Sequence, residues 1–513
     1  MDAEAITALR DEEIQTWNTQ EESADMMVPL IGNLYRKHNI VTTIFGKGLV
    51  HQNSIDIIKL HSYVCKHVGK DMMPSDTLPV LQVISELDAL SATRLDLGRT
   101  YLLVCGSANT LTPTKDDIKR ILRDVITRHR QTSPRALSLT KPRDIVLYGF
   151  GRIGRLLARL LVEKSGSGAK LMLRAIVVRK GSKEDLKKRA SLLRRDSVHG
   201  NFNGTIAFNE EANAFIANGN VIQVIYSDGP DKCDYTQYGI ENAVVIDNTG
   251  IWRDLEGLGR HLKSPGVSKV VLTAPPKGSA ISTVVAGVND HIIKPETQIY
   301  SCASCTTNAI TPLLYALDNK YGIDEGHIET VHSFTNDQNL IDNYHAKERR
   351  GRSAVMNMVI TETGAGAAVE KCLPQLKNKL TANSIRVPTP NVSLAIMTLH
   401  LNREKTGRDL TVEEINSYCA KLSLNSPLQH QIDFINSNEA ASSDFVGYRA
   451  AGIVDGQATI VRGNKIILYV WYDNEFGYSC QVLRVVQKIC GISLPKFPDE
   501  SNVDAIDSAL NFA

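Results

Sequence analysis

The sequence predicts a doubly wound α/β fold, preceded by a mostly helical region of about 140 residues. The short apolar run 144–148 leads directly into a glycine-rich turn at 149–154, and residues 155–163 then have the periodicity of an amphipathic helix. Four later apolar runs are typical of buried parallel strands, namely 171–178, 243–247, 269–273 and 283–288. These observations together predict an open parallel sheet with helices on both of its faces.

The first 140 residues contain stretches whose apolar residues recur at helical spacing, namely 11–18, 27–38, 54–68 and 115–129. Asp116 and Asp117 fall in the first turn of the last of these helices, where their negative charges interact favourably with the helix dipole and stabilise the helix. The polar stretch 132–142 contains two prolines and is interpreted as a linker. No motif with recognisable chemistry occurs in this region.

Composition excludes several classes of protein. The chain has 513 residues, of which 42% are hydrophobic, so it is not disordered throughout. Its formal net charge is only +2, which gives no electrostatic reason to expect a nucleic acid as its partner. The longest apolar runs, 101–105 and 466–471, are far shorter than the ~18–20 residues that cross a bilayer, and residues 1–4 do not resemble a signal peptide. The nine cysteines are scattered, and Cys302 and Cys305 have no companions for a zinc site. We therefore expect no metal, no membrane and a cytoplasmic location.

The turn at 149–154 has the GxGxxG pattern between a strand and a helix. In that context Gly149 permits a tight turn, Gly151 lets the backbone approach a pyrophosphate, and Gly154 lets the helix pack closely on the strand. The helix N-terminus offers free N–H groups to the phosphates. The pattern predicts dinucleotide binding, and the alternative is an ordinary strand-to-helix turn.

The end of the next strand bears on which dinucleotide is bound. An acidic residue usually holds the ribose hydroxyls there, but the strand is followed by Arg179 and Lys180, and the next acid is Glu184. Two cations suit a 2′-phosphate, so we hypothesise that NADP is accepted, and even preferred to NAD. The alternative is that both cations belong to a solvated loop and that Asp196 or another acid holds the ribose.

A cysteine and a histidine are the candidate catalytic residues. Ser304 suits a helix N-cap, which places Cys305 in the first turn of a helix, where the dipole lowers the pKa of a thiol. His332 follows 27 positions later, after a β-prone run, and a Cys/His pair is a recurring nucleophile with its base. Cys302 lies outside the helix and is interpreted as structural. The alternative is a buried cysteine and an unrelated histidine.

Seven motifs resemble those of the phosphorylating glyceraldehyde-3-phosphate dehydrogenase family, in the same order and at the same spacing. They are GFGRIGR (149–155), ASCTTN (303–308), TVHSFTNDQ (330–338), RRGR (349–352), TETGA (361–365), RVPTPNVS (386–393) and WYDNEFGYS (471–479). The resemblance covers roughly residues 142–492. It implies a Rossmann-type dinucleotide-binding domain over 141–304, completed by a helix at about 479–492, and an α+β catalytic domain over 305–478. Residues 1–140 form an N-terminal helical extension outside the resemblance.

The resemblance also implies a reaction, the reversible oxidation of glyceraldehyde 3-phosphate to 1,3-bisphosphoglycerate with NAD or NADP and inorganic phosphate. Cys305 attacks the aldehyde to give a thiohemiacetal, and its own N–H helps to hold the oxyanion. His332 acts as the base while hydride passes to the nicotinamide. Inorganic phosphate then attacks the remaining thioester. A homotetramer is implied as well.

Binding residues follow from the matched motifs and from strand ends. Thr335, Asp337 and Arg386 match the substrate-phosphate site. The inorganic-phosphate site is matched by Ser304, Thr306, Arg350, Thr363 and Gly364. The expected cofactor-binding residues are Gly149, Gly151, Arg152, Ile153, Gly154, Arg179, Lys180, Thr249, Gly250, Thr273, Asn474 and Tyr478. Asn474 holds the nicotinamide carboxamide in the family, and Tyr478 supports it.

The sequence departs from the family at three places. Tyr148 replaces the usual Asn, Lys180 replaces the Asp of NAD-specific members, and the loop 342–345 lacks their Leu-Pro. The last two departures favour NADP tolerance, and with it a gluconeogenic role. Two alternatives remain open, an erythrose-4-phosphate dehydrogenase and a catalytically silent regulatory homologue. Thr335, Asp337 and the TETGA motif favour the triose enzyme, and the intact catalytic pair argues against a silent homologue.

Overall fold

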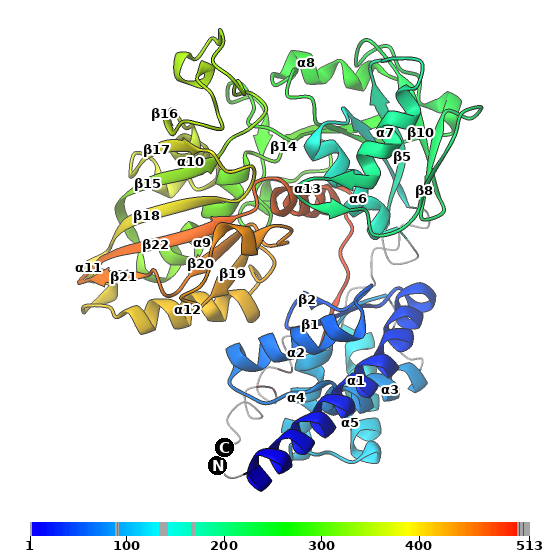
Figure 1. The fold of residues 1–513 in the computed structure, drawn as a ribbon, viewed down its shortest axis with the longest axis vertical. Coiled ribbons are helices and arrows are strands. Elements are labelled where there is room, and N and C mark those ends of the chain that lie inside the picture. Colours follow the sequence, from blue (N-terminus) through cyan, green and yellow to red (C-terminus); the bar gives the residue numbers. More distant parts are fainter. Residues whose placement is uncertain are drawn as a thin grey trace. The chain divides into compact units, whose positions relative to one another are not determined.

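The computed structural model describes residues 3–87, 90, 92–132, 142–165, 170–499, 502 and 506. The chain divides into two compact units (Figure 1). The smaller comprises Met1–Lys141, Ser165–Lys170 and Ile492–Ala513, and the larger comprises Pro142–Lys164 and Leu171–Gly491. Apart from its two ends, the predicted linker at 132–142 lies outside the described residues.

The smaller unit is mostly helical, as predicted. Its helices are α1 (Ala3–His38), α2 (Ser54–Val68), α3 (Pro74–Leu87), α4 (Leu97–Ala108) and α5 (Lys115–Thr132). The two helices predicted at 11–18 and 27–38 are one continuous helix, because no glycine or proline interrupts residues 19–28. The prediction missed α3 and α4, whose largely apolar sequences are buried on more than one side.

A small sheet completes this unit and joins distant parts of the chain. Its strand order is β2 (Lys47–Gly48), β1 (Val41–Ile44), β3 (Arg94–Asp96) and β23 (Lys496–Phe497). β23 pairs in parallel with β3, and the carbonyl of Pro495 accepts hydrogen bonds from the N–H of Arg94 and the hydroxyl of Thr93, both at 2.7 Å. Phe497 is fully buried. The C-terminal segment is therefore part of the smaller unit.

The larger unit contains the predicted doubly wound sheet, in which the strand order is β13-β14-β12-β11-β4-β5-β10-β9-β8. Its parallel strands are β4 (Arg143–Tyr148), β5 (Leu171–Val178), β10 (Asn220–Tyr226), β11 (Ala243–Asp247), β12 (Val267–Leu272), β13 (Ser282–Thr283) and β14 (Ile299–Ser301). An antiparallel extension is formed by β9 (Ala214–Ala217) and β8 (Ile206–Asn209). The helices of this part are α6 (Arg152–Glu163), α7 (Asp185–Arg194), α8 (Leu255–Gly259) and α13 (Phe476–Ile489).

One predicted strand of this sheet is mostly wrong. Residues 283–288 were expected to be a strand, but β13 ends at Thr283. The chain then turns, because the amide of Asn289 binds the backbone at Thr283 and Val285, and Gly287 takes a positive φ of 83°. The apolar side chains there are still buried, so hydrophobicity alone could not separate strand from turn.

A second, mixed sheet has the order β16-β17-β15-β18-β22-β20-β19, and β21 pairs with β22. Its strands are β15 (Ile323–Ser333), β16 (Val359–Thr361), β17 (Leu380–Val387), β18 (Ser393–Leu401), β19 (Ile432–Ile435), β20 (Gly452–Asp455), β21 (Ile460–Arg462) and β22 (Lys465–Tyr472). Helices α9 (Cys305–Tyr321), α10 (Ala365–Cys372), α11 (Arg403–Thr406) and α12 (Val412–Leu424) accompany it (Figure 1). In the parallel pair β15·β17, His332 is in register with Arg386, which brings two candidate site residues together.

Candidate active site

The predicted nucleophile and base meet where α9 begins and β15 ends. Cys305 is the first residue of α9, and Ser304 is its N-cap, with the Ser304 hydroxyl accepting a 3.1 Å bond from the N–H of Thr307. The Sγ atom of Cys305 lies 3.6 Å from Nε2 of His332. Cys305 is partly exposed, whereas Cys302 is buried, which suits the structural role predicted for it.

The turn that precedes Cys305 is held by several polar contacts. Ala303 takes a left-handed conformation with φ of 57°, which costs about 1–3 kcal/mol in a non-glycine residue. The amide of Asn308 donates to the carbonyls of Cys302 and Ser304, at 2.8 and 2.9 Å, and the Tyr478 hydroxyl donates to the Ala303 carbonyl at 3.0 Å. Tyr478 thus contacts the nucleophile turn. Its expected support of Asn474 is not among the hydrogen bonds of the described residues.

Electrostatics favour a neutral pair. Burial raises the pKa of the Cys305 thiol, outweighing the opposing effect of Arg386, so the net lowering expected from the helix start is not found. Burial, followed by the positive charge of Arg386, lowers the pKa of His332 to about 3. Nδ1 of His332 lies 2.7 Å from the Ser333 carbonyl, which only accepts hydrogen bonds, and we therefore assign the proton to Nδ1. The two hydrogens on the nearby Nη1 of Arg386 are then given to the same carbonyl and to the Thr335 hydroxyl, at 3.0 and 3.2 Å. The Nε2 lone pair then faces the thiol, as a base requires.

Four of the predicted phosphate ligands form one cluster. Nη1 of Arg386 donates to the Thr335 hydroxyl at 3.2 Å and lies 2.9 Å from Nδ1 of His332. Asp337 accepts a hydrogen bond from Thr335 and forms an ion pair with Arg350. The pKa of Asp337 lies below its usual value because these two partners outweigh the cost of burial. Two guanidinium groups beside Cys305 and His332 make this cluster suited to anions.

The other predicted phosphate ligands lie at two helix starts. Thr363 and Gly364 precede α10, where the Thr363 hydroxyl accepts a 3.2 Å bond from the N–H of Ala365 and a Cβ on Gly364 would meet nothing within 4 Å. The Ser304 hydroxyl is engaged in capping α9. The Thr306 hydroxyl lies 2.9 Å from that of Tyr472. The hydroxyls of Ser304 and Thr306 are thus both hydrogen-bonded within the fold.

The glycine turn has the features needed to hold a dinucleotide. Gly149 has φ of 96°, and a Cβ on Gly154 would come within 2.4 Å of the Gly149 carbonyl oxygen, so α6 packs directly on the turn. A Cβ on Gly151 would meet nothing within 4 Å, which leaves room for a ligand against the backbone. Gly151 is the N-cap of α6 and has no side chain that could accept hydrogen bonds from the helix. The N–H groups of the first helical residues, Arg152 and Ile153, are therefore available to a phosphate.

The remaining predicted cofactor residues lie at strand ends, as expected. Thr249 and Gly250 follow β11, and Thr273 follows β12. The Thr249 hydroxyl donates to Oδ1 of Asp247 at 2.7 Å, and that of Thr273 donates to the Asp247 carbonyl at 3.1 Å. The carboxyl ends of these neighbouring strands therefore form one polar edge beside the glycine turn.

Arg179 and Lys180 follow β5 and are both exposed. Nζ of Lys180 lies 5.7 Å from the ring centre of Tyr226. Asp196, the alternative holder of the ribose, instead accepts bonds from Arg152 at 2.9 and 3.2 Å and from the N–H of His199 at 2.9 Å. Its carboxylate is therefore committed to a contact within the protein.

Some polar residues around Asn474 were not predicted. The hydroxyls of Ser333 and Ser393 donate to Oδ1 of Asn474, at 2.8 and 3.2 Å, and so orient its amide. His199 lies in a buried group with Arg152 and three carboxylates. Ser333 and Ser393 do fall within quoted motifs, but nothing in the local sequence pairs them with position 474.

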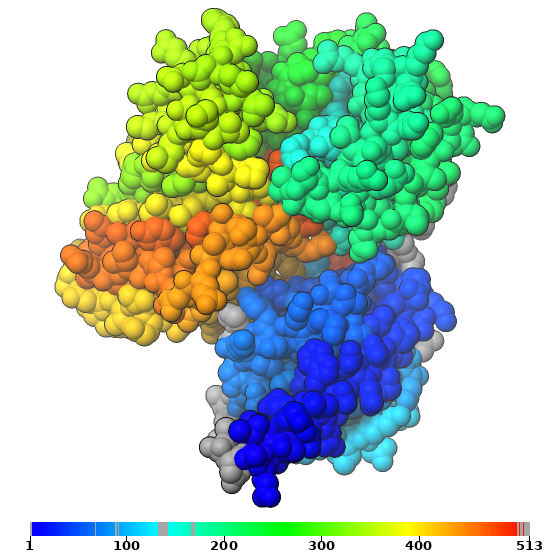
Figure 2. Space-filling view, in the orientation of Figure 1, coloured from blue at the N-terminus to red at the C-terminus, as the bar shows by residue number. Residues whose placement is uncertain are grey.

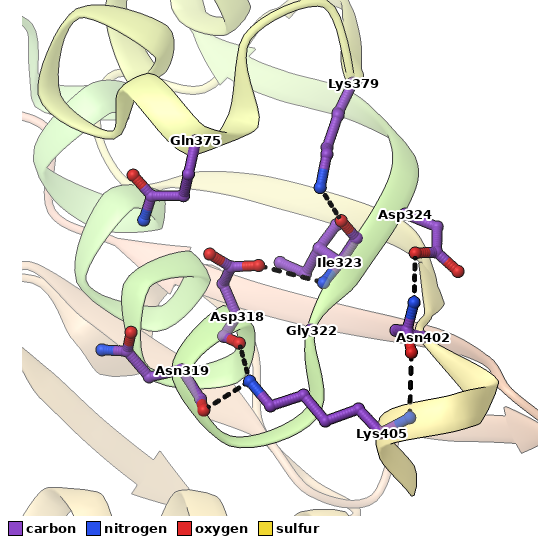
Figure 3. Close-up of a pocket in the computed structure, with 9 residues that line it drawn as sticks. All are labelled: Asp318, Asn319, Gly322, Ile323, Asp324, Gln375, Lys379, Asn402 and Lys405. Carbon is purple, nitrogen blue, oxygen red and sulfur yellow. Dashed lines mark hydrogen bonds between the residues drawn. The ribbon is translucent and has the colours of Figure 1, made fainter.

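A shallow cavity of about 360 Å³ lies at the opposite end of α9 from Cys305 (Figure 3). Nζ of Lys405 donates to the carbonyls of Asp318 and Asn319, at 3.0 and 2.8 Å, and Nζ of Lys379 donates to that of Ile323 at 2.6 Å. Both ammonium groups thus satisfy backbone carbonyls at and just after the end of α9. Their bonds explain this cavity as a helix C-terminus closed by lysines.

The fold and the site together define a class, a two-domain dehydrogenase fold in which a Rossmann sheet adjoins a domain that carries a Cys/His pair. Residues 143–255 match the family model "Glyceraldehyde 3-phosphate dehydrogenase, NAD binding domain", and residues 304–474 match the C-terminal domain of the same family. The chain belongs to the glyceraldehyde-3-phosphate dehydrogenase family.

Full-length relatives support the same assignment. A "Glyceraldehyde-3-phosphate dehydrogenase-like protein" of Pseudomonas aeruginosa is 54% identical over 92% of this chain and 100% of its own length. The glyceraldehyde-3-phosphate dehydrogenase of Thermotoga maritima is 40% identical over 67% of this chain and 98% of its own. The chloroplastic enzyme GAPB of Arabidopsis thaliana is 37% identical over 62% and 68%. The Pseudomonas match therefore extends into the helical region that the other two leave uncovered.

Two kinds of feature are absent from the described residues, a membrane-spanning helix and a metal site. No helix there combines the length and apolar character needed to cross a membrane. In the same residues, no group of three or more His, Cys, Asp or Glu side chains is arranged to hold a metal ion.

Proposed function

We propose that the chain catalyses the reversible, NAD(P)-dependent phosphorylating oxidation of glyceraldehyde 3-phosphate to 1,3-bisphosphoglycerate. The observation that carries this proposal is the 3.6 Å contact between Sγ of Cys305 and Nε2 of His332, with Arg386 joining His332 to the anion-binding cluster. A nucleophile, a base and a phosphate site within one small region are what this reaction needs. The relatives that are named as glyceraldehyde-3-phosphate dehydrogenases support the same reaction.

Cys305 attacks the aldehyde carbon, and Nε2 of His332 takes the thiol proton as the thiohemiacetal forms. The neutral state of both groups suits this transfer, because the base is unprotonated at physiological pH. As the first residue of α9, Cys305 has a backbone N–H without an intrahelical acceptor, which stabilises the developing oxyanion. Transfer of the carbon-bound hydrogen, as hydride, to a bound dinucleotide would convert the thiohemiacetal oxyanion into a thioester. Inorganic phosphate then attacks the thioester carbon and releases the cysteine thiolate, which takes its proton back from Nε2 of His332.

The residues of the glycine turn, with the polar strand ends, hold the dinucleotide, and Asn474 binds its carboxamide. When bound, the nicotinamide supplies the hydride acceptor of the oxidation. We propose that NADP is accepted at least as well as NAD, because Arg179 and Lys180 are exposed at the end of β5 and Asp196 is bound to Arg152. Comparing kcat/KM for both dinucleotides tests this, and a large preference for NAD would contradict it.

Phosphate dependence is the decisive test of the reaction. Purified protein with NAD or NADP should form the reduced dinucleotide from glyceraldehyde 3-phosphate only when inorganic phosphate or arsenate is present, and C305S should abolish the reaction. Erythrose 4-phosphate as the better substrate would favour the alternative dehydrogenase. No turnover with either aldehyde, despite dinucleotide binding, would favour a silent regulatory homologue.

A homotetramer is part of the proposal, supported by large apolar side chains that are exposed on the segment 340–360, which is yellow-green in Figure 2. They are Leu340, Ile341, Tyr344, Val355, Met356, Met358 and Ile360, and Tyr344 is 91% exposed. Several large exposed apolar side chains on one segment are typical of an interface between subunits. Light scattering on the full chain should give about four times the mass of one chain, and a monomer would contradict it.

The proposal also includes domain limits and a location. We propose an N-terminal extension over 1–140, a dinucleotide-binding domain over 141–304 with the helix near 479–492, and a catalytic domain over 305–478. A cytoplasmic location is supported by the nine free cysteines. Limited proteolysis with mass spectrometry checks the limits, and labelling of thiols in intact cells checks the location.

A further inference from the structure

A buried polar cluster beside Asn474 has no part in the reaction steps given above. At its centre is His199, whose side chain is only 4% exposed and whose ring stacks on that of Phe476, with ring centres 5.8 Å apart. Nε2 of His199 lies 2.9 Å from Oδ2 of Asp473, and Nδ1 lies 3.4 Å from Nη2 of Arg152. Both ring nitrogens therefore have partners, one on each side of the site.

The direction of these bonds follows from the partners. The Asp473 carboxylate only accepts, so Nε2 of His199 donates to it, and the amide nitrogen of Asn391 lies 3.2 Å from the same ring nitrogen. Nδ1 faces Nη2 of Arg152 at 3.4 Å, with Asp196 at 3.6 Å and Glu475 at 3.7 Å. A continuous series of polar contacts therefore runs from Arg152 through the imidazole to Asp473.

Arg152 anchors the chain at the glycine turn, because it is the first residue of α6. Its guanidinium is bidentate to Asp196, at 2.9 and 3.2 Å, and bidentate to Glu475, at 2.5 Å for both contacts. These bonds leave little freedom for the side chain, while the backbone N–H groups at the start of α6 stay available for phosphates.

Asp473 anchors the other end, in the loop between β22 and α13. Its Oδ1 accepts from the N–H groups of Glu475 and Phe476, at 2.9 and 2.7 Å, and its Oδ2 accepts from that of Gly447 at 2.8 Å. Asn474 sits between the two anchored residues, Asp473 and Glu475. Its Oδ1 is already bound by two serine hydroxyls, so its Nδ2 is the atom left for a ligand amide.

We propose that His199 is a positioning residue, which with Arg152 and Asp473 couples the glycine turn to Asn474 and so sets the geometry of nicotinamide recognition. The inference rests on the proposed function, because it assumes that a dinucleotide spans both places. Removal of the ring bonds should therefore weaken binding of the nicotinamide end selectively, while the adenosine and pyrophosphate contacts remain.

The test uses two ligands and full-length protein. H199F keeps a ring to stack on Phe476 but loses the hydrogen bond to Asp473 and the polar contact with Arg152, and Arg152 keeps its two carboxylates. Dissociation constants are measured by calorimetry for NADP or NAD and for the matching fragment without nicotinamide, phosphorylated ADP-ribose or ADP-ribose. We expect the Kd of the whole dinucleotide to rise ~10-fold and that of the fragment to stay within ~2-fold. H199Q, which can still donate to Asp473, should recover part of the loss.

Two further variants make the result specific. E163Q breaks the Glu163–Arg449 ion pair, at 2.7 and 2.9 Å, at the other end of α6, and should change neither Kd. In a double-mutant cycle, H199F should cost little more once N474A is present, because both act on one contact. An equal loss for both ligands, or no loss for either, in H199F and H199Q would overturn the inference. Failure of the wild type to bind any dinucleotide would instead overturn the proposed function.

Discussion

At His332, burial and hydrogen bonding act on the same ring in different ways. Burial keeps the ring neutral across the physiological range by lowering its pKa to about 3, and the Ser333 carbonyl fixes which nitrogen carries the proton. The first effect keeps the base available and the second aims its lone pair at Cys305. The protonation state and the orientation of His332 therefore depend on its surroundings in the fold, whereas the sequence could only predict that this residue is the base.

His332 should make the protein less stable in acid. Its pKa is lower in the folded state than its ordinary value of 6.5, so the unfolded state binds the proton first and stability falls as the pH drops from about 6.5 towards 3. At pH 4.5 the loss amounts to about 3 kcal/mol. H332Q should therefore lose less stability between pH 7 and 4.5 in urea unfolding. Parallel curves for the two proteins would contradict this.

Arg386 should tune the thiol as well as bind phosphate. It is the first of the effects that lower the pKa of Cys305, so R386L should raise the pH midpoint for alkylation of Cys305 by iodoacetamide. KM for glyceraldehyde 3-phosphate should rise in the same variant, because a phosphate ligand is lost. R352L is a matched control, since Arg352 is exposed and pairs with Asp342. An unchanged midpoint and KM in R386L would remove Arg386 from the site.

At the scale of elements, the glycine turn shows how three identical residues meet three different demands. Gly149 has a positive φ, and Gly154 lets the helix backbone lie close to the Gly149 carbonyl. Gly151 leaves space beside the backbone for a ligand. The approach involves backbone on both sides, so no side-chain adjustment can relieve a substitution at Gly154. The same short motif therefore separates a role in folding from a role in binding.

G154A and G151A should separate these two roles. A Cβ at 154 would lie 2.4 Å from the Gly149 carbonyl oxygen, so G154A should destabilise the protein by about 1–3 kcal/mol, as overpacking does. G151A meets no protein atom within 4 Å and should keep the wild-type Tm while weakening dinucleotide binding several-fold. Thermal unfolding and calorimetry measure both. A reversed pattern would refute the assigned roles.

Elements with a local cause were predictable from the sequence. β5 and β11 have their predicted limits, and α9 begins at Cys305 because Ser304 is a good N-cap. The positive φ of Ala303 could not be predicted from the local sequence. This conformation of the turn is held by hydrogen bonds from Asn308 and from Tyr478, which is distant in the sequence. The His199 cluster was missed for the same reason, since Asp473 lies 274 positions from His199 in the sequence.

At the scale of the whole chain, the smaller unit is assembled from both ends of the sequence. Phe497 is buried, pairs through β23 with β3, and has its ring 5.2 Å from that of His129 in an edge-on contact. The C-terminal segment therefore contributes both a strand and core side chains to a unit that is otherwise N-terminal.

Truncations should reveal this arrangement. Deleting residues 1–141 alone uncovers Phe497 and the edge of β23, so the product should aggregate. Deleting residues 492–513 as well should restore solubility, because the larger unit has its own sheets and core. Size-exclusion chromatography and the rate of Cys305 alkylation measure the two outcomes. Equal solubility of both deletions would argue against the pairing of β23.

The parallel pair β3·β23 also imposes an order on synthesis. A ribosome exposes residues 94–96 some 400 positions before their neighbour at 496–497, so the first unit to emerge is the last to be completed. The larger unit is therefore inserted in the sequence between the two parts of the smaller unit. During translation the larger unit can fold completely before β23, the last strand of the smaller unit, has been synthesised.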